Sequence, residues 1–229
     1  DGTFRLAYAL AGTGAGHGMT AIEQVVTAEF LLRLVAGMVV NFKIAGIAMV
    51  VGLVFGLFLA VARLGPAFVR SATIPVLGLM RAAPTFVVMF FLLNAVPPGA
   101  TMFGISVTLS GVMIVALSLV PYSATYVADN GVEAIRQWRD DSPLGALQFL
   151  PNVTRVFFVL VMASGTGAAI GVSEGIAVIL HEAERMSSLG EKLVLFAIGV
   201  LCFGAVLQGG FALINLLHRR ISRRFTIAS

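Results

Sequence analysis

The sequence predicts an all-α integral membrane protein built as a five-helix transmembrane bundle. Of its 229 residues, 59% are hydrophobic and only 11% are charged, whereas soluble domains contain about 25% charged residues. A helix needs roughly 20 apolar residues to cross the hydrocarbon core of a bilayer. Runs without Asp, Glu, Lys or Arg occupy 44–62, 82–128, 156–173 and 193–218. They lack the alternation of barrel strands, so we expect helices, which satisfy every backbone amide in lipid.

The run 82–128 is too long for a single crossing. The segment "NAVPPGA" at 94–100 interrupts it with adjacent prolines and a glycine, which end helices. We therefore predict two spans within this run and five spans in the whole chain. The predicted bounds are 36–63, 70–96, 106–127, 152–171 and 193–217.

Basic residues predict the orientation of the chain. The tail "HRRISRRF" contains four arginines, and segments rich in Lys and Arg stay in the cytoplasm. An odd number of spans places the two ends on opposite sides, so we expect the C-terminus in the cytoplasm and the N-terminus outside. Residues 1–35 are then an external or surface-lying arm, 36–224 the membrane domain and 225–229 a short tail. The net charge of +4 follows from this topology, so membrane lipid, and not nucleic acid, is the expected partner.

The chain contains no pattern that predicts an enzyme. The sequence lacks the glycine-rich phosphate loop of ATPases, and His181 with its neighbouring glutamates lacks the second histidine of the H-E-x-x-H zinc motif. The one cysteine, Cys202, lies within the fifth predicted span and is expected to pack there. We therefore expect no catalytic residue, no metal and no cofactor in this chain.

The second predicted span contains a charge and a helix breaker. Arg81 lies within "LMRAAPTF", and a charge inside a span is costly unless it snorkels, pairs or faces water. Pro84 removes a helix hydrogen bond and should kink or break the helix. Arg81, Pro84 and Thr85 are therefore candidates for a pathway or a hinge. Alternatively, Arg81 only reaches the cytoplasmic boundary or caps carbonyl groups at the kink.

Two other segments predict local packing. Gly52 and Gly56 form a small-xxx-small pair, which lets membrane helices approach closely. The stretch 163–192 passes from glycine-rich to acidic sequence, and we expect it to form a short helix folded back near the outer surface. No acidic residue is expected deep in the bundle.

The segment "EAIRQWRDDSPLGALQFLPN" at 133–152 is a charged island between apolar runs. It contains two arginines, two aspartates, a glutamate and the only tryptophan, Trp138. The predicted topology places it in the cytoplasm between the third and fourth spans. It is either a plain connecting loop or the place where a partner outside the membrane binds.

These segments together resemble the permease subunits of bacterial ATP-binding-cassette importers of the polar amino acid family. "MRAAPTFVVMFFL" is similar to the family's Arg-Gly-Thr-Pro element and the apolar run after it, and "AIGVSEGI" is similar to its Ile-Gly-Val-x-Glu element. The first predicted span, "LVPYSATYVADNGVEAI" and the basic ending "LLHRRISRRF" also resemble the family. The resemblance covers about 36–224 and implies a type I importer permease in the bacterial inner membrane.

The resemblance also implies a short coupling helix in the cytoplasmic loop, seated in a cleft of an ATPase. The candidate matches are Glu133, Ala134, Gly145, Leu150 and Pro151. Their spacing departs from the family pattern, because Gly145 lies too far from Glu133 and too close to Leu150. Alternatively, "GVEAI" precedes the coupling pattern, and "RDDSPLGALQFLPN" is a shortened remnant of it within the coupling region 130–151.

The family's function is shared among several chains. The resemblance implies two cytoplasmic ATPases with ATP and Mg²⁺, a second permease subunit, and an external binding protein that delivers an amino acid or a similar small polar solute. Transport would proceed by alternating access. The altered coupling loop suggests a heteromeric pair whose other permease has the fuller loop.

Two other classes of function are compatible with the sequence. A membrane scaffold or sensor subunit would keep the bundle and the charged island without moving solute. An independent channel or secondary transporter should contain acidic residues or a proton relay in its spans, and the third to fifth predicted spans contain almost none.

Overall fold

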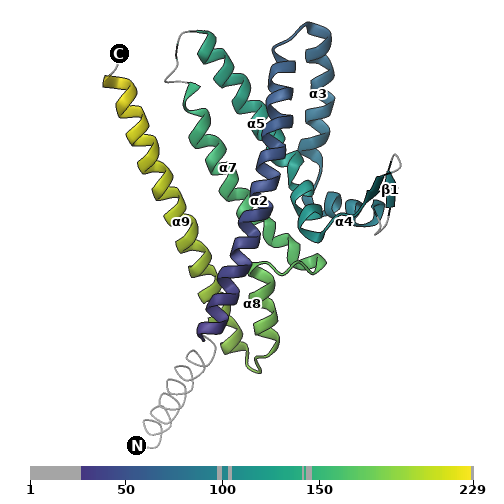
Figure 1. Ribbon diagram of the computed structural model, residues 1–229, viewed down its shortest axis with the longest axis vertical. Coiled ribbons are helices and arrows are strands. Elements are labelled where there is room, and N and C mark those ends of the chain that lie inside the picture. The colour runs from purple at the N-terminus through teal and green to yellow at the C-terminus, as the bar shows by residue number, and fades with distance from the viewer. Residues whose placement is uncertain (1–26, 97–99, 103–104, 141, 143–145, 228–229) are drawn as a thin grey trace, which may run out of the picture.

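The computed structural model describes residues 27–96, 100–102, 105–140, 142 and 146–227 (Figure 1). The described elements are helices and one short hairpin. In chain order they are α2 (Ala28–Arg63), α3 (Ala67–Ala82), α4 (Thr85–Ala95), β1 (Ala100–Met102), β2 (Ile105–Val107), α5 (Gly111–Arg139), α7 (Phe149–Ala163), the 3₁₀ helix η1 (Ser164–Ile170), α8 (Gly175–Glu184) and α9 (Leu189–Ile227). The two strands pair antiparallel, with Thr101 opposite Ser106.

Within the described residues, four helical segments are long and apolar enough to cross a membrane, namely α2, α5, α7 with η1, and α9. The pair α3 and α4 also qualifies when taken together, but the two helices meet at an angle of 93°. Counting this pair as one broken span gives five spans. The predicted five-span helical bundle is therefore confirmed, and its second span is broken between α3 and α4.

Helix α2 has a charge-free stretch of the length that a bilayer requires. Thr27 caps the N-terminus of the helix by accepting a hydrogen bond from the Phe30 N–H at 3.1 Å. Between Lys43 and Arg63 the helix has no charged residue, and a rise of ~1.5 Å per residue makes this stretch about 30 Å long. The part of the predicted arm from 28 to 35 continues this helix, and the earlier part, 1–26, lies outside the described residues.

Helices α2 and α5 pack closely because small residues lie at their crossing. A Cβ atom on Gly52 would come within 2.6 Å of the Ser123 Cβ, and one on Gly56 would come within 2.6 Å of the Ala124 carbonyl oxygen. Ser123 also donates its hydroxyl to the Ala48 carbonyl of α2 at 3.0 Å. The predicted close approach at the small-xxx-small pair is confirmed, and α5 is the partner helix.

The largest hydrophobic core lies between α2, α5 and α7 and includes the buried residues Ile44 and Leu119. A second cluster joins the start of α2 to α8 and α9 through residues such as Phe30 and Leu195. A third and much smaller cluster attaches α3 to α2 and α5. Helix α3 is thus attached to the core clusters by only a small apolar contact.

Several element boundaries differ from the predicted spans. Helix α5 begins at Gly111, because 105–107 form strand β2, and it continues past the predicted end at 127 to Arg139. The beginning of the charged island is therefore a helical extension of the third span. Helix α9 likewise extends to Ile227. Hydropathy marks only the apolar part of a helix, so it does not reveal these polar extensions.

Figure 1 shows how the links are distributed between the two ends of the bundle. The link between α5 and α7 and the end of α9 lie at one end, whereas α8 and the start of α2 lie at the other. The short helix predicted within 163–192 is confirmed as α8. The chain turns into it through Gly171, whose φ of 79° is readily available only to glycine.

Candidate functional site

The break in the second span lies at the sequence "RAAPT". Pro84 is the N-cap of α4 and Thr85 is its first residue. Proline has no amide hydrogen to donate to α3, which disfavours continuing that helix, and its carbonyl accepts the first hydrogen bond of α4 from the Val88 N–H at 3.1 Å. The prediction that Pro84 kinks or breaks the helix is confirmed. Broken helices at membrane depth occur where protein or a water-filled cavity surrounds them.

Arg81 lies beside this break and forms an ion pair. Its Nη2 donates to both carboxylate oxygens of Asp129 on α5, at 2.8 Å each. Arg63, the last residue of α2, donates to the same carboxylate at 2.6 Å. Pairing is thus how the structure accommodates the charge of Arg81. Sequence reasoning missed Asp129, which lies one position beyond the charge-free run 82–128.

A pocket of about 340 Å³ adjoins the ion pair between the broken span and α5. Its walls combine aromatic, hydroxyl and charged side chains. The lining residues are Met80, Arg81, Ala83, Thr85, Tyr122, Thr125, Tyr126 and Asp129. The side chains of Arg81 and Asp129 are about half exposed, so they present polar surface to this space. The structure therefore brings two of the three predicted pathway residues, Arg81 and Thr85, into one pocket, and the third forms the adjoining break.

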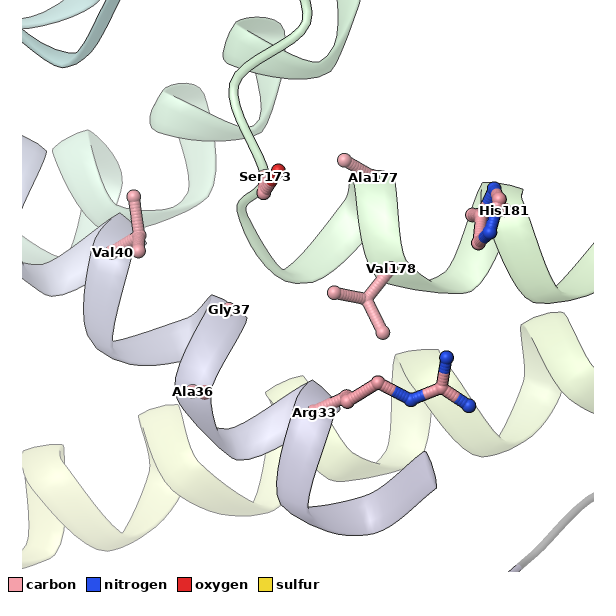
Figure 2. A pocket seen from close by; sticks show the side chains of 8 residues that line it. All are labelled: Arg33, Ala36, Gly37, Val40, Ser173, Ala177, Val178 and His181. Carbon is pink, nitrogen blue, oxygen red and sulfur yellow. The ribbon is translucent and has the colours of Figure 1, made fainter. Parts of the chain in front are cut away.

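A second pocket of about 380 Å³ lies between α2 and the α8 region (Figure 2). Figure 2 shows Arg33 extending from α2 toward α8, which also bears His181. The Arg33 guanidinium donates to the Glu182 carboxylate of α8 at 3.3 Å. Most of the remaining lining is small or aliphatic, including Ala36, Gly37, Val40, Ala177 and Val178. The ion pair thus joins α2 and α8 across this space.

Next to the second pocket, Glu174 is fully buried. Its carboxylate accepts hydrogen bonds from the Asn41 side-chain amide at 2.8 Å and from the Ile176 and Ala177 N–H groups at 2.9 Å. Glu174 lies outside the candidate spans, and burial raises its pKa above the ordinary value, against the opposing effect of these hydrogen bonds. Glu174 is thus a buried carboxylate just beyond the fourth span, where Asn41 and the first amides of α8 satisfy it.

Asn41 links three segments of the bundle. Besides Glu174, its amide donates to the Ser164 hydroxyl at 2.8 Å, and its carbonyl oxygen accepts from the Gly175 N–H at 2.9 Å. A Cβ atom on Gly37 would come within 2.9 Å of the backbone at Gly175. The turn before α8 is therefore docked into a notch on α2 that requires glycine at one side and asparagine at the other.

The predicted ATPase-coupling residues lie at the end of the bundle that bears the α5–α7 link. Glu133 and Ala134 are part of α5, and Leu150 and Pro151 are in the first turn of α7. The remaining candidate, Gly145, lies outside the described residues. Trp138 and Leu150 are large and exposed. This end therefore presents apolar surface next to charged residues.

Comparison with known proteins supports the fold through structure and not through sequence. No family model matches the chain, and no curated protein matches it. A solved structure described as the crystal structure of an amino acid ABC transporter with histidines contains a similar chain, with a TM-score of 0.64 at 15% sequence identity. The match covers 84% of this chain and 95% of that chain. The protein is thus a multi-pass helical membrane protein with the fold of a chain from an amino acid ABC transporter.

Proposed function

We propose that the protein is a permease subunit of an ATP-driven importer for an amino acid or a similar small polar solute. The observation that carries this proposal is the fold likeness over nearly all of the matched chain. The broken second span with a polar pocket beside it supports the same function. Discontinuous helices are a recurring way to build solute sites within membrane transporters.

The pocket beside the broken span is the proposed segment of the solute pathway. Arg81 and Asp129 place one positive and one negative group on its wall, and Thr85 adds a hydroxyl. Such a wall suits a solute that bears a carboxylate, an ammonium group or both. Pro84 holds the break that gives the pocket its shape.

The end of the bundle with the α5–α7 link is the proposed contact with the ATPase. Its exposed Trp138 and Leu150 provide the kind of apolar and aromatic anchors that protein interfaces use. Two ATPase subunits, which would hydrolyse ATP with Mg²⁺, would dock at this end of the bundle. A second permease subunit would complete the pathway. An external binding protein would deliver solute at the end bearing α8. In this proposal the chain lies in a bacterial inner membrane with its C-terminus in the cytoplasm.

Cysteine crosslinking tests the contact with the ATPase. In a Cys202→Ala background, Ser142→Cys should crosslink to a co-purifying ATPase subunit, because Ser142 is exposed in the α5–α7 link. Ser187→Cys, exposed in the link between α8 and α9 at the other end, is the matched control and should not crosslink to it. Crosslinking from neither site would mean that this chain does not dock the ATPase through the α5–α7 link.

Transport by the purified complex tests the function itself. Proteoliposomes that contain the complex and its external binding protein should accumulate amino acid only when ATP is supplied. Arg81→Gln and Pro84→Ala should reduce this uptake. Uptake that is independent of ATP would instead support a channel or secondary transporter, and a complex whose uptake is insensitive to both substitutions would favour a scaffold or sensor subunit.

A further inference from the structure

Helix α3 is attached to the rest of the bundle by a small amount of apolar contact. Of its 16 residues only Thr73 and Leu77 are buried. The cluster that holds it consists of Leu59, Leu77 and Ala128, with Met80 packed against them. In contrast, glycines allow α2 and α5 to interlock. The pair α2 and α5 is therefore a rigid part of the bundle, and α3 is an element that can move against it.

Both ends of α3 have a feature that permits such movement. At its start, the chain passes from α2 through residues 64–66, which include Gly65 and Pro66. At its end, Ala83 and Pro84 separate it from α4, with the 93° bend. Hinges of this kind absorb a change of backbone angle without disturbing the packed helices on either side.

Asp129 of α5 fastens the end of α3 and the end of α2 to one carboxylate. It accepts hydrogen bonds from Arg63, next to the first hinge, and from Arg81, next to the second. A carboxylate between two guanidinium groups is attracted to both, whereas the guanidinium groups repel each other when it is removed. Asp129 therefore contributes to the position of α3 in a way that neither arginine can replace.

Asp129 lies on α5 between the pocket beside the broken span and the α5–α7 link. Tyr122, Thr125 and Tyr126, which line the pocket beside the broken span, precede it on the same helix. Arg139, where α5 ends and the α5–α7 link begins, follows it without a break in the helix. A displacement of the link would therefore be transmitted along α5 to Asp129 and to the pocket wall.

We propose that Asp129 is a positioning residue for transport: its ion pair with Arg81 holds α3 against α5, its ion pair with Arg63 ties the end of α2 to the same carboxylate, and together they make the broken span follow the movement of the α5–α7 link. The proposal rests on the proposed permease function. Asp129 then couples ATP hydrolysis to the pocket, and it fixes the position of Arg81 on the pocket wall.

Transport and ATPase measurements on the full complex test the role in coupling. Asp129→Asn should lower the amount of solute taken up per ATP hydrolysed, measured at saturating solute, by about tenfold. Asp129→Glu keeps the charge and should retain most of the uptake. The charge exchange Asp129→Arg with Arg81→Asp should recover part of it. Unchanged uptake per ATP hydrolysed in Asp129→Asn would overturn the proposal.

A distance measurement separates this proposal from the proposed function, because it needs no ATPase. Spin labels on the exposed positions Ile74 of α3 and Val54 of α2, in the full-length Cys202→Ala chain in nanodiscs, report the position of α3. Asp129→Asn should broaden this distance distribution, and labels at Val54 and Trp138 should show that the α2–α5 distance is unchanged. An unchanged α3 distance would overturn the proposal even if transport is demonstrated. A broadened distance in a chain that supports no ATP-driven transport would contradict the permease function alone.

Asp129→Asn leaves two arginines without their carboxylate and can unfold the chain. The double substitution Asp129→Asn with Arg81→Gln removes one of these charges and serves as the second variant. It should fold, and it should still show the broadened α3 distance and the loss of coupling. If this double variant shows the native distance and native coupling, Asp129 has no positioning role.

Discussion

Asn41 of α2 satisfies polar groups on η1 and at the start of α8, where the fourth span turns into α8. Its side chain donates to Glu174 and Ser164 and accepts from Gly175. Each of these groups is buried, and a buried polar group that loses its partner costs more than the net value of one hydrogen bond. This residue therefore determines how α8 is placed on α2.

We expect Asn41→Ala to destabilise the protein by about 1–3 kcal/mol or more, because it leaves the Glu174 carboxylate and the Gly175 N–H without their side-chain partner. Unfolding in detergent, followed by circular dichroism, measures this change. Asn94→Ala is the control: Asn94 is exposed and only donates to the Phe90 carbonyl of its own helix, so the effect should stay within about 0.5 kcal/mol. Equal effects of the two substitutions would show that the buried network adds little.

The charged side chains show which features of single residues can be predicted from the sequence. Arg81 was identified because a charge inside an apolar run is costly. The pairing of Arg81 with Asp129 and the burial of Glu174 were not identified. Both depend on contacts between residues far apart in the chain, because they follow from how α5 packs against α3 and how α8 folds onto α2. The signal for Asp129 was available in its position directly after an apolar run.

The pairing of α2 with α5 is the element-scale feature on which the bundle depends. The two helices approach closely because Gly52 and Gly56 present no side chain to α5. In a membrane, where the hydrophobic effect does not hold helices together, such close contact provides much of the attraction. A single methyl group at this crossing therefore has a large effect.

We expect Gly52→Ala and Gly56→Ala each to destabilise the protein by about 1–3 kcal/mol, since the added methyl group overlaps atoms of α5. Gly46→Ala on the same helix is the matched control, because a Cβ atom there has no neighbour within 4 Å. Because alanine has a higher helix propensity than glycine, Gly46→Ala should leave the stability of the protein unchanged or raise it by up to about 1 kcal/mol. Thermal unfolding in detergent compares the three variants, and similar melting temperatures for Gly46→Ala and Gly52→Ala would rule out a steric requirement at the crossing.

The break between α3 and α4 gives a further element-scale prediction. With Pro84→Ala, the amide hydrogen that a continuous helix needs is restored. If α3 and α4 then join, spin labels at Ile74 and Phe91 should separate toward the ~26 Å between these Cα positions in a straight helix. Pro75→Ala, within the unbroken part of α3, should leave this distance unchanged. An unchanged distance in Pro84→Ala would show that packing, and not the proline, maintains the bend.

Element type was more predictable than element boundary. The apolar runs correctly predict helices and the position of the break, because both follow from local chemistry. The strands at 100–102 and 105–107 were not predicted, because their apolar residues look like part of a span. The polar extension of α5 was not predicted either, because hydropathy marks only the apolar part of a helix. The extension matters for function, because it makes the beginning of the charged island a rigid continuation of the pocket helix.

At the scale of the whole molecule, the bundle combines a rigid centre with a lightly packed periphery. The span within α9 is only 17% buried in this chain, and the window in α5 is 56% buried. Large apolar side chains such as Val200 and Leu201 of α9 remain exposed. Lipid can cover this surface, since lipid tails are as apolar as these side chains. The overall fold was predictable from the sequence because the bilayer restricts a chain of such runs to helical spans.

The distribution of links between the two ends of the bundle yields a prediction of orientation. Ser142 and Ser187 are exposed in links at opposite ends, and the basic tail predicts that the end with Ser142 faces the cytoplasm. In a Cys202→Ala background, a membrane-impermeant maleimide should label Ser187→Cys in spheroplasts and Ser142→Cys only in inside-out vesicles. If Ser142→Cys and Ser187→Cys are labelled from the same side, the chain does not cross the membrane an odd number of times between α5 and α8. Labelling of Ser142→Cys from the outside alone would reverse the orientation and, with it, the assignment of the α5–α7 link to a cytoplasmic ATPase.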